Sequence, residues 1–341
     1  MNAHRSPVRF LALMALTAFA VCRADEQAKP PGAEDLRGAI TRSLDFLAKE
    51  GDEWVAKKDC NGCHHMPELL WSHREAKLRG FVVDQKKFDE WTAWATEHAT
   101  DKKPGLEHAA LLLLALTGRP MPEVTKLIAA EQKPDGSWKP GGQFSGMQHR
   151  GGPDAQANSM RVFLLGLAAP QPALPEAEAA RTKAAALLEK TAPATALESL
   201  VFRILYARRF GKPEEMDALH AEVLKLQHND GGWTSRIGEV QSDSLATGQA
   251  LYILNESRDP HAAEAVARAR RWLLGTQRED GSWLIDTTRI SKVDRSAPAK
   301  AKSLKDVTGI YQYWGTAWAT IGLLQSVPIA RETERGGESV R

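Results

Sequence analysis

Apolar residues recur along the chain at the three- and four-residue spacing of amphipathic helices, from residue 36 to about residue 328. This spacing predicts about twelve helical segments of two alternating kinds. The segments rich in charge are expected to form an outer ring, at residues 36–50, 84–100, 122–132, 173–190, 214–227 and 261–277. The segments poorer in charge are expected to form an inner ring, at residues 66–79, 106–117, 154–168, 195–209, 243–255 and 313–327. Six such pairs can close into an all-α (α/α)6 barrel.

A seven-residue pattern, Q-x-x-D-G-[SG]-W, occurs three times between predicted helices, at residues 132–138, 227–233 and 277–283. The distances along the chain from one copy to the next fit a repeat of about 48 residues, with one degenerate copy near residue 180. Asp-Gly makes a tight turn, and the Gln and Trp side chains are expected to tie neighbouring helix ends together. We interpret the pattern as a helix-to-helix connector, because flanks of helical periodicity do not suit a β-hairpin.

The repeated turn and the alternating helices resemble the QW motif of squalene-hopene cyclases, oxidosqualene cyclases and related prenyltransferase-type α/α toroids. The resemblance covers residues 36–328 and implies an (α/α)6 toroid of the terpenoid cyclase/prenyltransferase type. It leaves the activity open, because related toroids serve cyclases, protein prenyltransferases and non-enzymatic domains.

The pattern Cys-x-x-Cys-His occurs once, at residues 60–64, and has the form of a c-type haem attachment motif. In this interpretation Cys60 and Cys63 hold one covalent haem c, and His64 is the proximal iron ligand. Three alternatives stay open at this motif: a zinc site, a structural disulfide and a redox-active cysteine pair.

A sixth haem ligand is expected from the glycine-rich segment that follows the first repeated turn. Met147 and His149 are the candidates there, because both lie in a connection that emerges on the same barrel face as the haem motif. An open sixth position would instead favour ligand binding or oxidative chemistry over pure electron transfer.

The N-terminus has the features of a secretory signal peptide. Basic residues precede an apolar run at residues 10–21, which predicts a signal peptide at 1–24 followed by a leader at 25–35. The apolar run is too short to span a bilayer, and no later segment qualifies, so we expect an exported, periplasmic protein without a stable membrane span. Residues 329–341 are expected to form a polar tail.

The charge balance excludes one class of partner. With 45 Lys and Arg against 43 Asp and Glu, the chain lacks the basic surplus of a nucleic-acid-binding protein.

The cysteine count excludes a disulfide framework. Once the signal peptide is removed, Cys60 and Cys63 are the remaining cysteines.

The resemblance to triterpene cyclases raises the question of their catalytic acid. Those enzymes use an aspartic acid in an Asp-x-Asp-Asp or Ser-Asp-Cys stretch, and Asp243 matches that residue here. The companion positions hold Gln241 and Ser244 instead of carboxylates or cysteine. Asp243 also fits the N-cap of the inner helix that follows it.

Three hypotheses follow, and they leave open whether the protein is an enzyme. The first is a mono-haem c protein on a toroid scaffold, which performs electron transfer or haem-based oxidation near a hydrophobic pocket and meets a redox partner protein. The second is an isoprenoid or terpenoid cyclase-like enzyme that uses Asp243 as acid, and the third is a non-catalytic binding or scaffold domain. Aromatic residues that could line the mouth or cavity are Trp71, Tyr311, Tyr313, Trp314 and Trp318.

Overall fold

The fold is known from a computed structural model, which describes residues 33–57, 62–101, 106–141, 144, 154–169, 174–188, 193–285 and 296–330. Across these ranges the backbone forms helices joined by turns and irregular segments, with two isolated β-bridges. None of the described helices is both long and apolar enough to cross a membrane. The predicted signal peptide lies outside the described residues, as does the predicted tail beyond residue 330.

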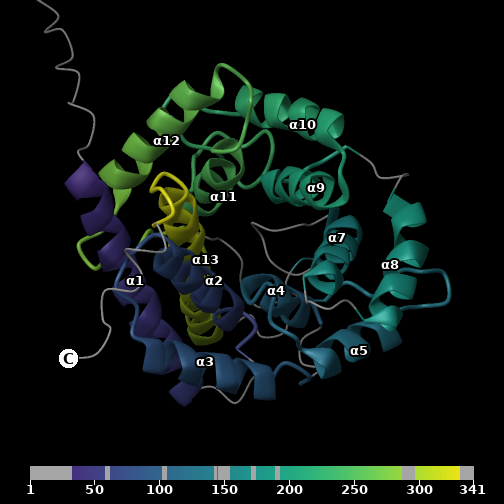
Figure 1. Ribbon diagram of the computed structural model, residues 1–341. Helices are drawn as coiled ribbons and strands as arrows, with labels where there is room; N and C mark the ends of the chain where they lie inside the picture. Colours follow the sequence, from purple (N-terminus) through teal and green to yellow (C-terminus); the bar gives the residue numbers. More distant parts are fainter. Residues whose placement is uncertain are drawn as a thin grey trace, which may run out of the picture. The chain divides into compact units, whose positions relative to one another are not determined.

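The described residues form twelve helices in two concentric rings, which Figure 1 shows along their common axis. The outer ring holds α1 (Ala33–Lys57), α3 (Gln85–Glu97), α5 (Pro122–Ala130), α8 (Pro175–Leu188), α10 (Pro213–Lys225) and α12 (Ala262–Thr276). The inner ring holds α2 (Met66–Leu78), α4 (Glu107–Ala115), α7 (Ala155–Ala168), α9 (Leu197–Phe210), α11 (Ser244–Leu254) and α13 (Ala297–Leu324). Each inner helix packs against the next, and α13 packs against both α11 and α2, which closes the ring. The predicted all-α toroid is confirmed.

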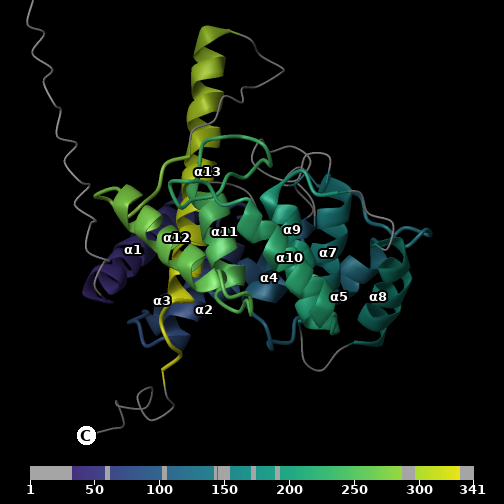
Figure 2. The same cartoon turned by 90° about the horizontal axis from the view of Figure 1, so that it is seen from above.

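Two predicted boundaries are wrong. The first outer helix was expected at 36–50 but runs from Ala33 to Lys57. The last inner helix was expected at 313–327 but begins at Ala297. Figure 2 shows the first turns of α13 standing clear of the other helices. Because these turns do not pack against the rings, they have no need of an apolar stripe, and the periodicity on which the prediction relied is missing there.

The repeated turns connect outer helices through the same two hydrogen-bonding side chains. In the second copy, Gln227 Nε2 donates to the carbonyl of Gly231 (2.9 Å) and to that of Ala265 on α12 (2.9 Å). Trp233 Nε1 donates back to Val223 O on α10 (2.8 Å). The side chains thus tie the end of one outer helix to the next outer helix, as the sequence predicted.

The third copy closes the outer ring. Gln277 Nε2 donates to Ala39 O on α1 (2.9 Å), and Trp283 Nε1 donates to Leu273 O on α12 (2.9 Å). Residue 281 must be glycine, because its φ is +84° and a Cβ there would lie 2.3 Å from the carbonyl oxygen of Arg42. The last outer helix is therefore held directly against the first.

A buried histidine makes the stability of this fold depend on pH. His73 on α2 is 5% exposed, its Nδ1 lies 2.9 Å from Leu69 O, and its ring packs against Trp91 of α3. Burial lowers the pKa of His73 from 6.5 to about 4, only partly opposed by the bond to Leu69. The folded protein therefore holds His73 neutral at pH values where the unfolded chain protonates it.

The stability that comes from keeping His73 neutral is fully present above pH 6.5 and is lost as the pH falls towards 4. Between pH 7 and pH 4 we expect His73 alone to lower the free energy of unfolding by about 3 kcal/mol. Urea unfolding at both pH values should show a smaller decline for His73→Gln, which cannot titrate. The exposed His261→Gln serves as control, and equal declines in the two variants would refute the assignment.

Candidate functional site

A cavity of about 680 Å³ lies where the inner helices α2, α4, α7, α9 and α11 end. Much of its wall is apolar and comes from Trp71, Leu114, Leu165, Leu205 and Tyr252, one residue from each of these helices. The volume falls within the range of about 300–1,000 Å³ that is usual for small-molecule sites. The inner ring thus forms a pocket of ligand size.

One side of the cavity has a wall of aromatic rings. The rings of Trp71 and Tyr252 meet edge to face with centroids 5.8 Å apart, and Trp318 of α13 lies behind both, at 5.4 Å and 5.9 Å. Burial raises the pKa of Tyr252, so its hydroxyl stays neutral. Such a wall suits an apolar or unsaturated ligand.

Two arginines in the wall cap the ends of neighbouring inner helices. Arg74 Nη1 donates to Leu114 O (2.8 Å) and Ala115 O (2.7 Å) at the end of α4. Arg209 Nη2 donates to Ala168 O (2.8 Å) at the end of α7. Carbonyl groups at a helix C-terminus carry partial negative charge, so these bonds also place positive charge favourably.

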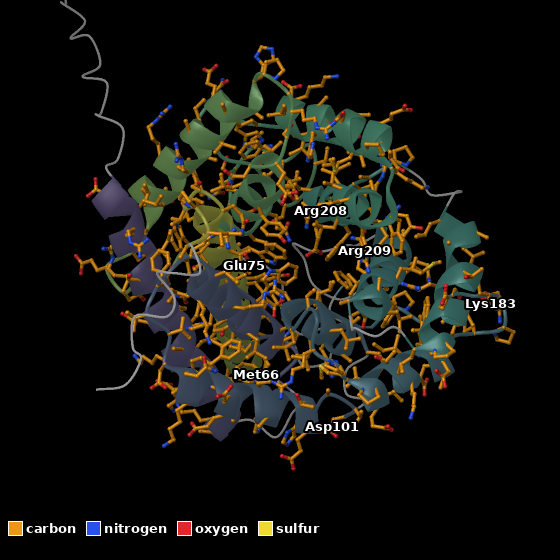
Figure 3. All side chains as sticks on the ribbon, viewed as in Figure 1. Met66, Glu75, Asp101, Lys183, Arg208 and Arg209 are labelled. Atoms are coloured by element: carbon orange, nitrogen blue, oxygen red, sulfur yellow. The ribbon has the colours of Figure 1, made fainter. Side chains whose placement is uncertain are left out.

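A third arginine lies against the aromatic wall. Arg208 Nη1 donates to Glu256 Oε2 (2.7 Å), and its guanidinium lies 5.7 Å from the centre of the Tyr252 ring. Burial opposes the charge of Arg208, but Tyr252 and Glu256 outweigh it and raise the pKa of the guanidinium. Figure 3 shows Arg208 and Arg209 on the inner side of the ring, with Lys183 on its periphery.

Glu75 lies close to the cavity but is not suited to donate a proton. Arg74 Nη2 donates to its Oε1 (2.8 Å) and Arg79 Nη1 donates to its Oε2 (2.6 Å). Burial would raise the pKa of Glu75, but the hydrogen bond from Arg74 and the charges of both arginines outweigh it and lower the pKa. Glu75 is therefore a carboxylate that fixes two guanidinium groups.

Asp243 lies at the opposite end of α11 from the cavity. Its Oδ1 accepts from Ala246 N (2.8 Å), which makes it the N-cap, and its Oδ2 accepts from Ser235 N (2.7 Å). Tyr252 follows nine residues later, about 13 Å along the helix axis. The structure shows the capping role of Asp243, and its use as an acid stays a prediction.

The described half of the Cys-x-x-Cys-His motif is packed among aromatic rings. Cys63 is buried, and His64 meets the rings of Trp54 and Trp314 edge to face, with centroids 6.2 Å and 5.3 Å away. No group of three His, Cys, Asp or Glu side chains that could hold a metal occurs in the described part of the chain. Outside that part lie Cys60, Met147 and His149.

Most of the cavity was not anticipated from the sequence. Trp71 was a candidate for a cavity wall and lines it, whereas Trp314 and Tyr313 are buried beside the Cys-x-x-Cys-His segment. The arginines were missed, although Arg208 and Arg209 stand at the end of a predicted inner helix. The two adjacent arginines at that helix end were the sequence feature that could have indicated a charged cavity wall.

No family model matches the chain. A stretch of 63 residues, 18% of this chain, is 38% identical to a labda-7,13-dienyl diphosphate synthase from Streptomyces clavuligerus. That stretch covers only 11% of the synthase, so the similarity concerns a small part of that protein.

Solved structures share the fold over most of the chain. The type II terpene cyclase MstE from Scytonema matches 88% of this chain and 100% of its own, with 15% identity and a TM-score of 0.52. A variant of that cyclase, solved with its substrate geranylgeranyl dihydroxybenzoate, matches 87% of this chain and 98% of its own at 13% identity, with a TM-score of 0.53. A possible GH105 family member from Salmonella enterica matches 89% of this chain and 96% of its own at 14% identity, with a TM-score of 0.58. These likenesses show a terpene-cyclase-like α/α fold.

The prediction of a covalent haem c is corrected by these findings. Indole rings pack against His64, the proposed iron ligand, and the described residues offer no metal-ligating cluster. The solved structures that resemble the chain include a type II terpene cyclase and possible GH105 family members. The sixth-ligand interpretation of Met147 or His149 and the redox partner depended on the haem and are withdrawn with it.

Proposed function

We propose that this protein binds an isoprenoid in the cavity of its terpene-cyclase-like toroid. The observation that carries the proposal is the cavity of about 680 Å³ at the inner ring, with its aliphatic lining and the aromatic wall of Trp71 and Tyr252. Support comes from the cyclase of the same fold that was solved with a geranylgeranyl substrate, and from the short match to a diterpene diphosphate synthase.

The chemistry of the wall fits this class of ligand. Burial of a long branched hydrocarbon is favourable in proportion to the apolar area removed from water, at roughly 25 cal/mol per Å². Leu165 and Leu205 supply aliphatic contact on one side, while the rings of Trp71 and Tyr252 offer their faces and edges to double bonds. A polar metabolite of similar size would leave most of this surface unused.

Equilibrium dialysis with radiolabelled geranylgeraniol tests the proposal. We expect saturable binding of one molecule per chain, displaced by unlabelled geranylgeraniol and not by a small sugar. Binding that does not saturate would contradict the proposal. A variant with a filled cavity, treated in the Discussion, tests where the ligand sits.

Cyclisation of the bound isoprenoid is a second candidate function, and Asp243 is the residue at issue. Both of its oxygens accept backbone N–H groups, which is the arrangement of a helix cap. We expect Asp243→Ala to lower the free energy of unfolding by about 1–2 kcal/mol and Asp243→Asn by less, because asparagine still caps the helix.

Product analysis separates the two roles of Asp243. The protein is incubated with squalene and with geranylgeranyl diphosphate, and the extracts are examined by gas chromatography and mass spectrometry. If Asp243 only caps α11, a folded Asp243→Asn variant retains any cyclic product of the parent protein. A product that the parent forms and the folded Asp243→Asn variant lacks would show that Asp243 is the acid.

A further inference from the structure

The cavity combines an apolar wall with side chains that carry only positive charge. Among the described residues that line it, the charged ones are Arg74, Arg208 and Arg209, and no carboxylate belongs to the wall. All three stand at or near the ends of inner helices, at the same end of the ring. A ligand with its apolar part against Trp71 and Leu165 would therefore meet guanidinium groups at its other end.

The ion pairs around the cavity do not neutralise this charge. Glu75 accepts from Arg74 and Arg79, and Glu256 accepts from Arg208. Arg209 donates to a main-chain carbonyl and adds a further positive charge. Among the described residues, the two glutamates thus pair with three of these four arginines, and Arg209 is the positive charge that an anionic head group would meet.

Helix capping accounts for only part of what these arginines offer. A guanidinium has five N–H donors, and the bond from Arg209 to Ala168 O uses one of them. Arg208 caps no helix, since its Nη1 donates to Glu256 Oε2 and its Nη2 to the Tyr252 hydroxyl (3.4 Å). Donors remain on both residues, and guanidinium is the side-chain group best matched to phosphate or carboxylate oxygens.

We propose that the isoprenoid bound in this cavity carries an oxyanion head group, a phosphate ester or a carboxylate, held by Arg208 and Arg209 beside Arg74. This inference rests on the proposed function, because it identifies the head group of the same ligand. The hydrocarbon tail lies against Trp71 and Leu165, and the head group lies at the ends of the inner helices, where the surplus positive charge is.

Three ligands with the same tail test the inference by equilibrium dialysis: geranylgeraniol, geranylgeranyl diphosphate and geranylgeranoic acid. We expect at least one of the two anions to bind about tenfold or more tightly than the alcohol, with an advantage that shrinks as salt is added. The anion that binds more tightly identifies the head group as a phosphate ester or a carboxylate.

Variants assign the advantage to the arginines. Arg209→Gln should remove most of the tighter binding of the anion, and Arg209→Lys should keep a part of it. Arg271→Gln, an exposed site on α12, removes the same charge away from the cavity and should have no effect. Arg208→Gln is a second test. This change leaves Glu256 without the guanidinium that donates to it, and if the variant unfolds for that reason, Arg209→Gln still tests the head-group inference.

The outcomes separate this inference from the proposed function. If the alcohol binds as tightly as both anions, the head-group inference is wrong and isoprenoid binding stands. An anion advantage that survives in folded Arg209→Gln and Arg208→Gln variants would also overturn it. If no ligand of the series binds, the proposed function itself fails.

Discussion

Replacing Trp283 with alanine is expected to lower the free energy of unfolding by about 4 kcal/mol. The indole is 1% exposed, and its Nε1 donates to Leu273 O (2.9 Å). The substitution removes a large buried side chain and the shorter of two side-chain hydrogen bonds to that carbonyl, which keeps the bond from Thr276 Oγ1 (3.4 Å). Because this turn ties α12 to α1 through Gln277, the damage falls on the contact that closes the outer ring.

Trp272→Ala is the matched control. Trp272 lies on α12 only eleven residues before Trp283, but it is half-buried and its Nε1 bonds to the exposed Asp230 carboxylate (3.1 Å). We expect its loss to cost about 1 kcal/mol. Urea unfolding followed by far-ultraviolet circular dichroism measures both variants. Equal losses would show that the buried indole of the third turn does not hold α12 against α1.

Ala168→Trp is expected to weaken geranylgeraniol binding by about 100-fold or more while the protein stays folded. Ala168 ends α7 and lines the cavity, so an indole in place of its methyl group would take up space that the hydrocarbon needs. Ala168 is 2% exposed beside a cavity of about 680 Å³, so the stability of the variant is measured together with its binding.

Ala186→Trp is the control for this change. Ala186 is exposed on α8 in the outer ring, and the same substitution there adds an indole without entering the cavity. Equilibrium dialysis and thermal unfolding of both variants separate a blocked site from a damaged fold. If folded Ala168→Trp binds geranylgeraniol as the parent does, the ligand does not occupy this cavity.

The fold could be predicted from the sequence because its signals are local. Helical periodicity and the three copies of the repeated turn lie within short stretches, and the hydrogen bonds of Gln277 and Trp283 follow from residue types in one such stretch. The start of α13 was missed because its first turns stand clear of the rings and show no apolar stripe.

The cavity could not be predicted in the same way, because ring closure brings its parts together. Arg74 and Arg208 are far apart in the sequence, and both reach the cavity only because α2, α9 and α11 stand in one inner ring. A periodic pattern places each residue on a helix face. It does not say which helix ends share an opening.

The Cys-x-x-Cys-His motif shows the opposite error. Its spacing is specific, but haem attachment also requires an imidazole that faces open space for the porphyrin. The surroundings of His64, set by Trp54 on α1 and Trp314 on α13, come from helices far apart in the sequence. A short motif carries no information about such neighbours.

A crystal structure of the protein grown with geranylgeraniol tests the account most directly. We predict density for the hydrocarbon in the cavity, in contact with Trp71, Leu165 and Tyr252, and with its hydroxyl end towards Arg208 and Arg209. An empty cavity at ligand concentrations that saturate binding in solution, or a ligand bound elsewhere on the rings, would contradict it.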